Sequence, residues 1–211
     1  MAKKRGRKQQ QQANLIVIFL GILLAATFVV IIGARFLGNA VDFDVNQQSR
    51  QESESVQAQR QQFIRNLAPY AQELQKTYHI LPSITLAQAA LESNWGQSSL
   101  ASRYHNLFGV KSEDPANSQV LTTREYVNGE WQEVHARFRV YANDDASLLA
   151  HAQLLANGTD WNPQQYSDVL QATNYRTAAQ ALSDDGYATD PSYAEKLINV
   201  IETYHLSQYD Q

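Results

Sequence analysis

The chain has 211 residues but no cysteine, one methionine and five prolines, and its five histidines are dispersed. The lack of cysteine excludes disulfides, thiolate metal sites and a cysteine nucleophile. The histidines show neither an HExxH motif nor another spacing typical of a zinc site. Asp184-Asp185 is a weak calcium candidate, because no loop of spaced oxygen ligands surrounds the pair. We therefore expect neither a metal nor another cofactor.

Positive charge is concentrated at the N-terminus. Residues 1–14 carry five of the 17 Lys and Arg residues and no acid, a charge of +5. The rest of the chain holds 12 cations and all 21 acidic residues, a net charge of 12 − 21 = −9. Nucleic-acid binding needs clustered positive charge, so we expect no nucleic-acid partner for the main body. A hydrophobic content of 44% indicates instead a domain with a packed core.

Residues 15–34 form one long apolar run, LIVIFLGILLAATFVVIIGA, of 20 residues without a charge. A helix of that length spans about 30 Å, the thickness of the bilayer core. The basic tail 1–14 should stay in the cytoplasm, which places everything after the run outside the cell. The sequence thus predicts a single-pass anchor in the cell membrane. The anchor leaves room for a membrane-protein partner, although it has no decisive polar residue for docking.

Two other interpretations of this run are weaker. A signal peptide cleaved near Gly38-Asn39-Ala40 usually has an apolar core of only about 7–15 residues. A buried helix of a soluble domain would have polar positions within the run. Residues 35–62 follow, and their abundance of Gln, Ser and Glu predicts a polar stalk or a frayed helix.

Residues 63–211 have the length of one compact domain. Apolar residues recur at steps of three and four from Phe63 to Tyr78, as on the buried face of a helix. Other helices are predicted from Pro82-Ser83 to about 96, over 98–104 and near 178–182. A helix capped at Asn143 should run to Asn157, another should begin at Pro163, and a last one should have Asp190 as its cap and Pro191 as its first residue. With the hairpin described next, the domain is expected to be α+β and mostly helical.

Residues 120–141 predict a β-hairpin. Both halves alternate in hydrophobicity around Asn128-Gly129, which favours a two-residue turn. Such a turn pairs Tyr126 with Trp131 and Glu125 with Gln132. Glu125 then lies on the more apolar face with no cation opposite, which raises the cost of its ionisation.

Glu92 is the first candidate for chemistry. A glutamate at a helix end is most often an exposed surface residue. Here Ala90, Leu91 and Trp95 predict apolar surroundings, and the negative end of the helix dipole also opposes ionisation. Both effects raise the pKa of a carboxyl, as a general acid requires.

Four motifs carry a family resemblance: LPSITLAQAALESNWGQSSLASRYHNLFGVK, TREYVNGEW, FRVY and GYATDPSYAEKL. Together they make the chain from 63 to 211 resemble the glucosaminidase family of peptidoglycan hydrolases (glycoside hydrolase family 73). The resemblance implies a lysozyme-like fold, with a helical lobe, a β-lobe and a sugar-binding groove between them. It also implies cleavage of β-1,4 bonds in the glycan strands of the cell wall.

The resemblance assigns roles to six residues. Glu92 matches the catalytic general acid, Glu125 the second carboxylate, and Tyr187 a tyrosine that assists at the reacting sugar. Three residues match positions that build the substrate groove: Trp95, Asn106 and Phe108. Ordinary packing or a solvated hairpin carboxylate remains the alternative for Glu125, Tyr187, Trp95 and Phe108.

The implied reaction begins with proton donation from Glu92 to the glycosidic oxygen. Glu125 would activate a water from the opposite face if the two carboxyls stand about 6.5–9.5 Å apart, and the product would then be inverted. Alternatively, the acetamido group of the substrate takes part, and Glu125 or Tyr187 only assists. The sequence leaves both mechanisms open.

We therefore predict a membrane-anchored endo-β-N-acetylglucosaminidase that trims new glycan strands near the membrane. One alternative is a muramidase or lytic transglycosylase on the same fold; a transglycosylase needs no water-activating carboxylate. A second alternative is a catalytically silent glycan-binding or scaffold protein, although Glu92 argues against it.

Overall fold

The computed structural model describes residues 47, 50–127 and 130–211. The tail 1–14 and the apolar run 15–34 lie outside the described residues. Among the residues that are described, no helix is long and apolar enough to cross a bilayer. The chain divides into two compact units, Met1–Gln57 and Ala58–Gln211. In the first unit, residues 50–57 are helical, within the segment predicted as stalk or frayed helix.

The second unit begins with a helix through residues 58–78, which buries the face predicted from its periodicity. Leu67 and Leu74 are buried, whereas Phe63, Tyr70 and Tyr78 pack at the edge of the core. The chain then continues into α2 (Pro82–Ser93). Ten of its twelve residues are buried, so α2 is the central helix of the domain.

A residue from the far end of the chain caps the start of α2. Leu81 precedes the helix in an extended conformation and offers no side-chain cap. Instead, Asp210 Oδ1 accepts a hydrogen bond from the Ser83 amide, and Asp210 Oδ2 accepts one from Ser83 Oγ, both at 2.8 Å. A carboxylate at this position satisfies a free amide and complements the helix dipole. The C-terminal segment is therefore hydrogen-bonded to the start of the central helix.

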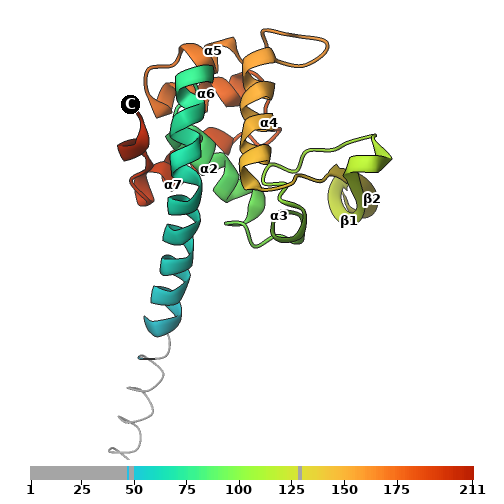
Figure 1. The fold of residues 1–211 in the computed structure, drawn as a ribbon, viewed down its shortest axis with the longest axis horizontal. Helices are drawn as coiled ribbons and strands as arrows, with labels where there is room; N and C mark the ends of the chain where they lie inside the picture. Colours follow the sequence, from blue (N-terminus) through green and yellow to red (C-terminus); the bar gives the residue numbers. More distant parts are fainter. Residues whose placement is uncertain (1–46, 48–49, 128–129) are drawn as a thin grey trace, which may run out of the picture. The chain divides into compact units, whose positions relative to one another are not determined.

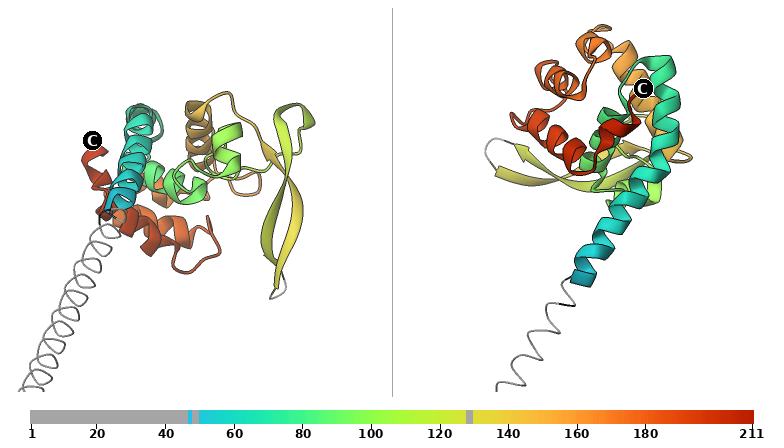
Figure 2. Two further views of the ribbon diagram at one scale, coloured as in Figure 1. Left: turned by 90° about the horizontal axis from the view of Figure 1, so that it is seen from below. Right: turned by 90° about the vertical axis from the view of Figure 1, so that its left-hand side faces the viewer.

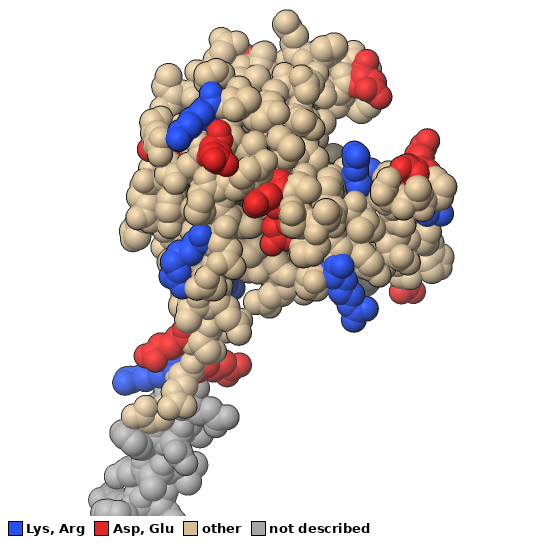
Figure 3. Space-filling view, in the orientation of Figure 1, with Lys and Arg blue, Asp and Glu red and all other residues tan. Residues whose placement is uncertain are grey.

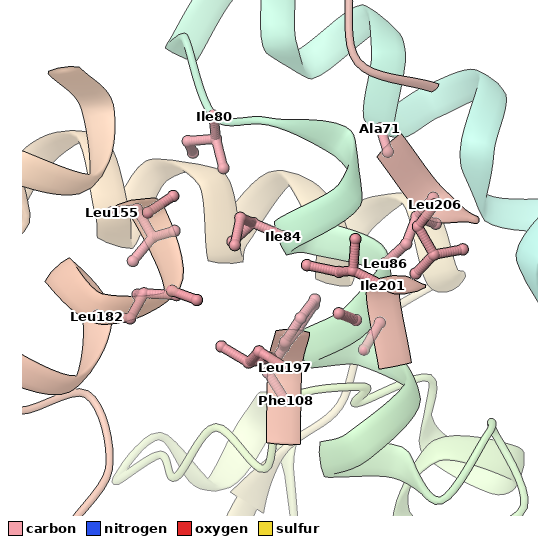
Figure 4. Close-up of a cluster of buried hydrophobic side chains, with 14 of the residues drawn as sticks. Ala71, Ile80, Ile84, Leu86, Phe108, Leu155, Leu182, Leu197, Ile201 and Leu206 are labelled. Atoms are coloured by element: carbon pink, nitrogen blue, oxygen red, sulfur yellow. The ribbon is translucent and has the colours of Figure 1, made fainter. Parts of the chain in front are cut away.

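The remaining helices are α3 (Ser99–Tyr104), η1 (Pro115–Asn117), α4 (Asp144–Asn157), α5 (Ser167–Gln171), α6 (Tyr175–Asp184), α7 (Tyr193–Thr203) and η2 (Leu206–Tyr209). Of these, α6, α7 and η2 pack directly against α2 (Figure 1). Asn143 caps α4, as predicted, and Ser98 caps the short helix α3. Leucine and isoleucine side chains from these helices meet in one core (Figure 4).

Two helices begin later than predicted. Pro163 lies in a series of turns, where Thr159 and Asn162 exchange two backbone hydrogen bonds of 3.0 Å, and α5 starts only at Ser167. Asp190 is not the cap of α7. Its Oδ1 accepts from the amide and hydroxyl of Ser192, at 2.9 and 2.7 Å, which closes a local turn before the helix.

The hairpin is a separate lobe made of β1 (Ser118–Val127) and β2 (Glu130–Arg139). Its register pairs Tyr126 with Trp131 and Glu125 with Gln132, which confirms the register predicted around Asn128-Gly129. Among the described residues it is a two-stranded antiparallel sheet. Figure 2 shows it as a twisted ribbon that projects from the helices. The mostly helical α+β architecture is thus as predicted.

Candidate active site

A cleft of about 600 Å³ opens between the helical lobe and the base of the hairpin. The space-filling view shows the surface hollowed between these two lobes (Figure 3). Its charged, polar and aromatic lining residues are Glu92, Phe108, Arg139, Tyr141, His151, Gln153, Asn157, Tyr166 and Tyr187. An open, largely aromatic cleft with one carboxyl suits an uncharged polar ligand such as a sugar.

A tight turn places Glu92 at the end of α2. Asn94, Trp95 and Gly96 follow the helix with φ values of 50°, 59° and 75°. Ser93 braces the turn, because its Oγ donates to the Ala89 carbonyl at 2.5 Å and accepts from the Gly96 amide at 2.7 Å. A positive φ at Asn94 and Trp95 is costly, since neither is glycine, and persists only where the surroundings impose it. These residues stop the helix one residue after Glu92.

The Glu92 carboxylate accepts a hydrogen bond from a buried tyrosine. Tyr193 of α7 donates its hydroxyl to Glu92 Oε1 at 2.8 Å, and Gln88 Nε2 donates to Tyr193 Oη at 3.0 Å. Glu92 keeps an exposed side toward the cleft, but the protein around it raises its pKa through lost hydration. The hydrogen bond from Tyr193 acts the other way, and the loss of hydration is the larger effect. A raised pKa favours the protonated acid.

Aromatic rings form the wall next to Glu92. Tyr187 stacks on Tyr193 with centroids 5.8 Å apart and meets His151 edge-on at 6.0 Å. Phe108 stacks face to face on His151 at 3.9 Å. Burial and the nearby charge of Glu92 raise the pKa of both Tyr187 and Tyr193, so these phenols are neutral hydrogen-bond donors.

His151 is a neutral imidazole in this wall. Its side chain is 1% exposed, and burial lowers its pKa to about 3. Within the described part of the chain, neither ring nitrogen has a hydrogen-bond partner, and the same holds for Tyr141 Oη. Buried polar atoms are normally paired.

Of the predicted groove residues, Phe108 lies in this cleft, whereas Trp95 and Asn106 do not line it. Trp95 packs against Phe63 and Tyr204 on the other side of the turn, with centroids 6.2 and 4.5 Å away. Asn106 is buried and bonds only backbone. Its Nδ2 donates to the carbonyls of Val110 and Arg139, and its Oδ1 accepts from the Val110 amide, all at 2.9 Å. It ties the loop that carries Phe108 to the end of β2.

Glu125 is placed only through its backbone, because its side chain lies outside the described residues. It sits in β1 opposite Gln132. Ser118, seven residues earlier in β1, pairs with Arg139, which lines the cleft. Along the strand, the backbone of Glu125 is therefore roughly 23 Å from that of Ser118. The predicted distance between the carboxyls of Glu92 and Glu125 stays a prediction.

Tyr193, His151 and Tyr141 are among the residues of the cleft region to which the sequence analysis assigned no role. Tyr193 lies inside the GYATDPSYAEKL motif and Tyr141 ends FRVY, so both were quoted without a role. His151 gave no signal, since a lone histidine on a helix is usually a packing residue. No group of three or more described His, Asp or Glu side chains is arranged to hold a metal ion.

Comparison with known proteins places this cleft in a family. Residues 68–206 match the Glucosaminidase family, described as mannosyl-glycoprotein endo-beta-N-acetylglucosaminidase. Exo-glucosaminidase LytG of Bacillus subtilis is 41% identical over 211 residues, which cover all of this chain and 71% of LytG. A probable N-acetylmuramidase of Lactococcus lactis subsp. cremoris is 37% identical over 151 residues, 70% of this chain and 34% of that protein.

Solved structures agree with these matches. The catalytic domain of the autolysin Auto from Listeria monocytogenes superposes with a TM-score of 0.68 at 36% identity. The match covers 76% of this chain and 97% of that domain. The helical lobe with a small two-stranded sheet is therefore the lysozyme-like fold of these glucosaminidases.

Proposed function

We propose, since this chain belongs to the glucosaminidase family of glycoside hydrolases, that it cleaves β-1,4 bonds in peptidoglycan glycan strands. The observation that carries the proposal is the environment of the Glu92 carboxyl. This carboxyl has a raised pKa and lies in an open cleft walled by Tyr187, His151 and Phe108. Relatives named as a glucosaminidase and as a probable muramidase support a glycan of the cell wall as substrate.

Glu92 acts as the general acid in this proposal. Protonated Glu92 donates to the glycosidic oxygen while the bond breaks through an oxocarbenium-like state. Tyr193 holds the carboxyl through Oε1, which leaves the other oxygen for the substrate. Tyr187 stands beside both residues and presents a neutral phenol to the reacting sugar.

Two arrangements complete the reaction. In the first, the hairpin bends toward the cleft when the strand binds, and Glu125 then activates a water on the opposite face of the sugar. In the second, the acetamido group of the substrate attacks, and Tyr187 or Glu125 stabilises it. Anomeric analysis of the first product separates them, because direct attack by water inverts the configuration and participation by the acetamido group retains it.

The bond specificity is proposed to be that of an N-acetylglucosaminidase. The LytG relative, matched along the whole of this chain, is named an exo-glucosaminidase. Release of sugar units from strand ends is therefore a second candidate mode of cleavage, besides the endo mode. The muramidase alternative is favoured by the name of the Lactococcus relative.

A digestion experiment tests the activity. The full-length chain, purified in detergent, is incubated with purified glycan strands, and the products are reduced with borohydride and read by mass spectrometry. Reduced glucosamine ends are expected, with strand shortening over time separating the endo from the exo mode. Reduced or anhydro-muramic ends would instead indicate a muramidase or a transglycosylase. Glu92→Gln should be inactive, and Glu195→Gln, an exposed glutamate on α7, is the matched control.

We also propose that residues 15–34 anchor the enzyme in the cell membrane with the catalytic domain outside. The support is the uncharged 20-residue run behind a basic tail. Because the chain has no cysteine, single cysteines can report the topology. A membrane-impermeant maleimide should label Ser207→Cys in whole cells but not Gln11→Cys. Labelling of both positions, or a secreted product that lacks its N-terminus, would contradict the proposal.

Anchoring also supports the role in trimming new glycan, since it confines the domain to strands close to the membrane. The membrane-tethered and untethered forms of the enzyme should then differ in their activity on mature cell wall. Equal activity of both forms on that substrate would contradict this role.

A further inference from the structure

Trp161 is an exposed tryptophan at the edge of the cleft. Its side chain is 82% exposed, whereas the other large apolar side chain exposed in the described part of the chain, Val120, is 43% exposed. Tryptophan is enriched at interaction surfaces, because its ring offers a large apolar face and its N–H a hydrogen-bond donor. Trp161 belongs to the connection between α4 and α5 (Figure 1).

The segment that carries Trp161 is held rigidly. Thr159 and Asn162 exchange backbone hydrogen bonds of 3.0 Å in both directions, so Asp160 and Trp161 form the tip of a tight turn. Thr159 Oγ1 donates to Gln165 Oε1 at 2.7 Å, and Gln165 Nε2 donates to the Asp185 carbonyl at 2.9 Å. The turn is therefore braced against the end of α6, and its ring is presented at little entropic cost.

The turn directly follows two residues that line the cleft. Asn157 and Gly158 line the cleft that contains Glu92. A Cβ on Gly158 would lie 2.2 Å from the Asn162 carbonyl oxygen, so the backbone next to Trp161 touches this lining residue. Trp161 is bonded to Asn162 and its Cα lies about 3.8 Å from that of Asn162. The backbone of Trp161 thus lies at the rim, next to the residues that line the cleft.

We propose that Trp161 is an outer sugar subsite, on which an N-acetylhexosamine of the same glycan strand stacks beyond the sugars that Glu92 acts on. The inference rests on the proposed function. The C–H face of a pyranose is apolar and slightly positive, and it fits the negative face of an indole. A strand bound in the cleft continues past its rim, which makes the next sugars the nearest partners for this ring.

Steady-state kinetics on glycan oligomers of increasing length test the subsite. Trp161→Ala should raise KM about tenfold on long oligomers, which equals about 1.4 kcal/mol, and leave kcat unchanged. Trp161→Phe should retain most of the affinity, because it keeps an aromatic ring. The shortest cleaved oligomers, which do not reach the rim, should show the same KM for all variants. Val120→Ala is the matched control for loss of an exposed apolar side chain.

An unchanged KM on long oligomers, or an equal rise on all lengths, would overturn the subsite. A binding measurement keeps this result separate from the proposed reaction. In the Glu92→Gln background, long glycan strands should bind less tightly when Trp161→Ala is added. If that loss is seen while the unmodified chain cleaves nothing, the subsite stands and the proposed reaction fails. If the chain cleaves glycan and the loss is absent, only the subsite fails.

Discussion

Tyr193 donates its hydroxyl to Glu92 Oε1 at 2.8 Å and thereby joins α7 to the end of α2. The contact lowers the pKa of a carboxyl that its surroundings otherwise raise. The two effects set the protonation of the same group from opposite directions. A general acid needs a pKa near the working pH, high enough to hold its proton and low enough to release it. Tyr193 is therefore a positioning residue that moderates the acidity of Glu92.

Replacement of Tyr193 by phenylalanine should move the pH profile upward. Tyr193→Phe keeps the ring stacked on Tyr187 but removes the hydrogen bond that stabilises the ionised carboxylate. The Glu92 pKa then rises further, and the alkaline limb of kcat/KM, where the acid loses its proton, shifts to higher pH. The variant also leaves Gln88 without its acceptor, at a cost of about 1–3 kcal/mol in stability.

Tyr204→Phe is the matched control for this profile. Tyr204 Oη accepts a hydrogen bond from Arg60 at 2.8 Å and lies against Trp95, away from Glu92. Its loss should leave the alkaline limb in place. A limb that moves downward in Tyr193→Phe, or that moves equally in both variants, would contradict the role given to Tyr193.

Glu92→Gln should remove activity without cost to the fold. General acid catalysis contributes about 10²–10⁴-fold in rate, so a loss of at least this size is expected. A carboxyl whose pKa is raised on folding contributes less stability as the pH rises above its unfolded value, since the folded state then holds a proton that the solvent favours removing. At pH 7 the neutral amide should therefore unfold at the same or a higher urea concentration. A destabilised variant that keeps its activity would contradict both points.

Short-range patterns predicted the parts of this fold that depend on neighbours in sequence. The register of β1 with β2 is the one predicted from the Asn128-Gly129 dipeptide, and Asn143 caps α4 as its position predicted. The misplaced starts of α5 and α7 followed from proline being taken as a first helical residue. In both cases a local turn uses the proline instead, and single-sequence patterns do not separate the two uses.

Long-range contacts account for what the sequence did not predict. The cap of α2 comes from Asp210, 127 residues away from Ser83, and no pattern near Pro82 indicates it. In the site, Glu92 was found from its own neighbours and the family motif, whereas its partner Tyr193 lies 101 residues further on. His151 was missed because its position between Phe108 and Tyr187 exists only in the folded chain.

The buried imidazole of His151 should make the protein sensitive to acid. Its pKa falls from 6.5 to about 3 on folding, so the unfolded state binds a proton between these values that the folded state does not. Stability is thus fully present above pH 6.5 and is lost as the pH falls toward 3. The loss is at most on the order of 4–5 kcal/mol at 1.36 kcal/mol per pK unit.

Urea unfolding of His151→Phe across this pH range tests the effect. Phenylalanine keeps a ring between Phe108 and Tyr187 but does not titrate, so the stability of the variant should fall less steeply with acid. His135→Phe, which replaces an exposed histidine on β2, is the matched control. Parallel stability curves for the wild type and His151→Phe would show that His151 does not cause the acid sensitivity.

Asn106 should prove to be a structural residue of the cleft. Asn106→Ala removes three hydrogen bonds and takes the side-chain partner from the Val110 amide and the Arg139 carbonyl, while the Val110 carbonyl keeps the Arg139 amide as a donor. Buried unsatisfied groups cost about 1–3 kcal/mol each, so a loss of about 2–4 kcal/mol is expected in urea unfolding. Asn117→Ala, which removes an exposed asparagine with one side-chain bond to Asp114, should cost less than about 0.5 kcal/mol.

The kinetics of Asn106→Ala separate support of the cleft from contact with substrate. The loop tied by Asn106 carries Phe108 and Val110 into the cleft. Loosening this loop should therefore lower kcat and raise KM together, at temperatures where the variant is folded. Asn106 itself does not line the cleft, and a rise in KM alone with unchanged stability is therefore not expected. That result would instead favour the role as a substrate-binding residue that the family resemblance implies.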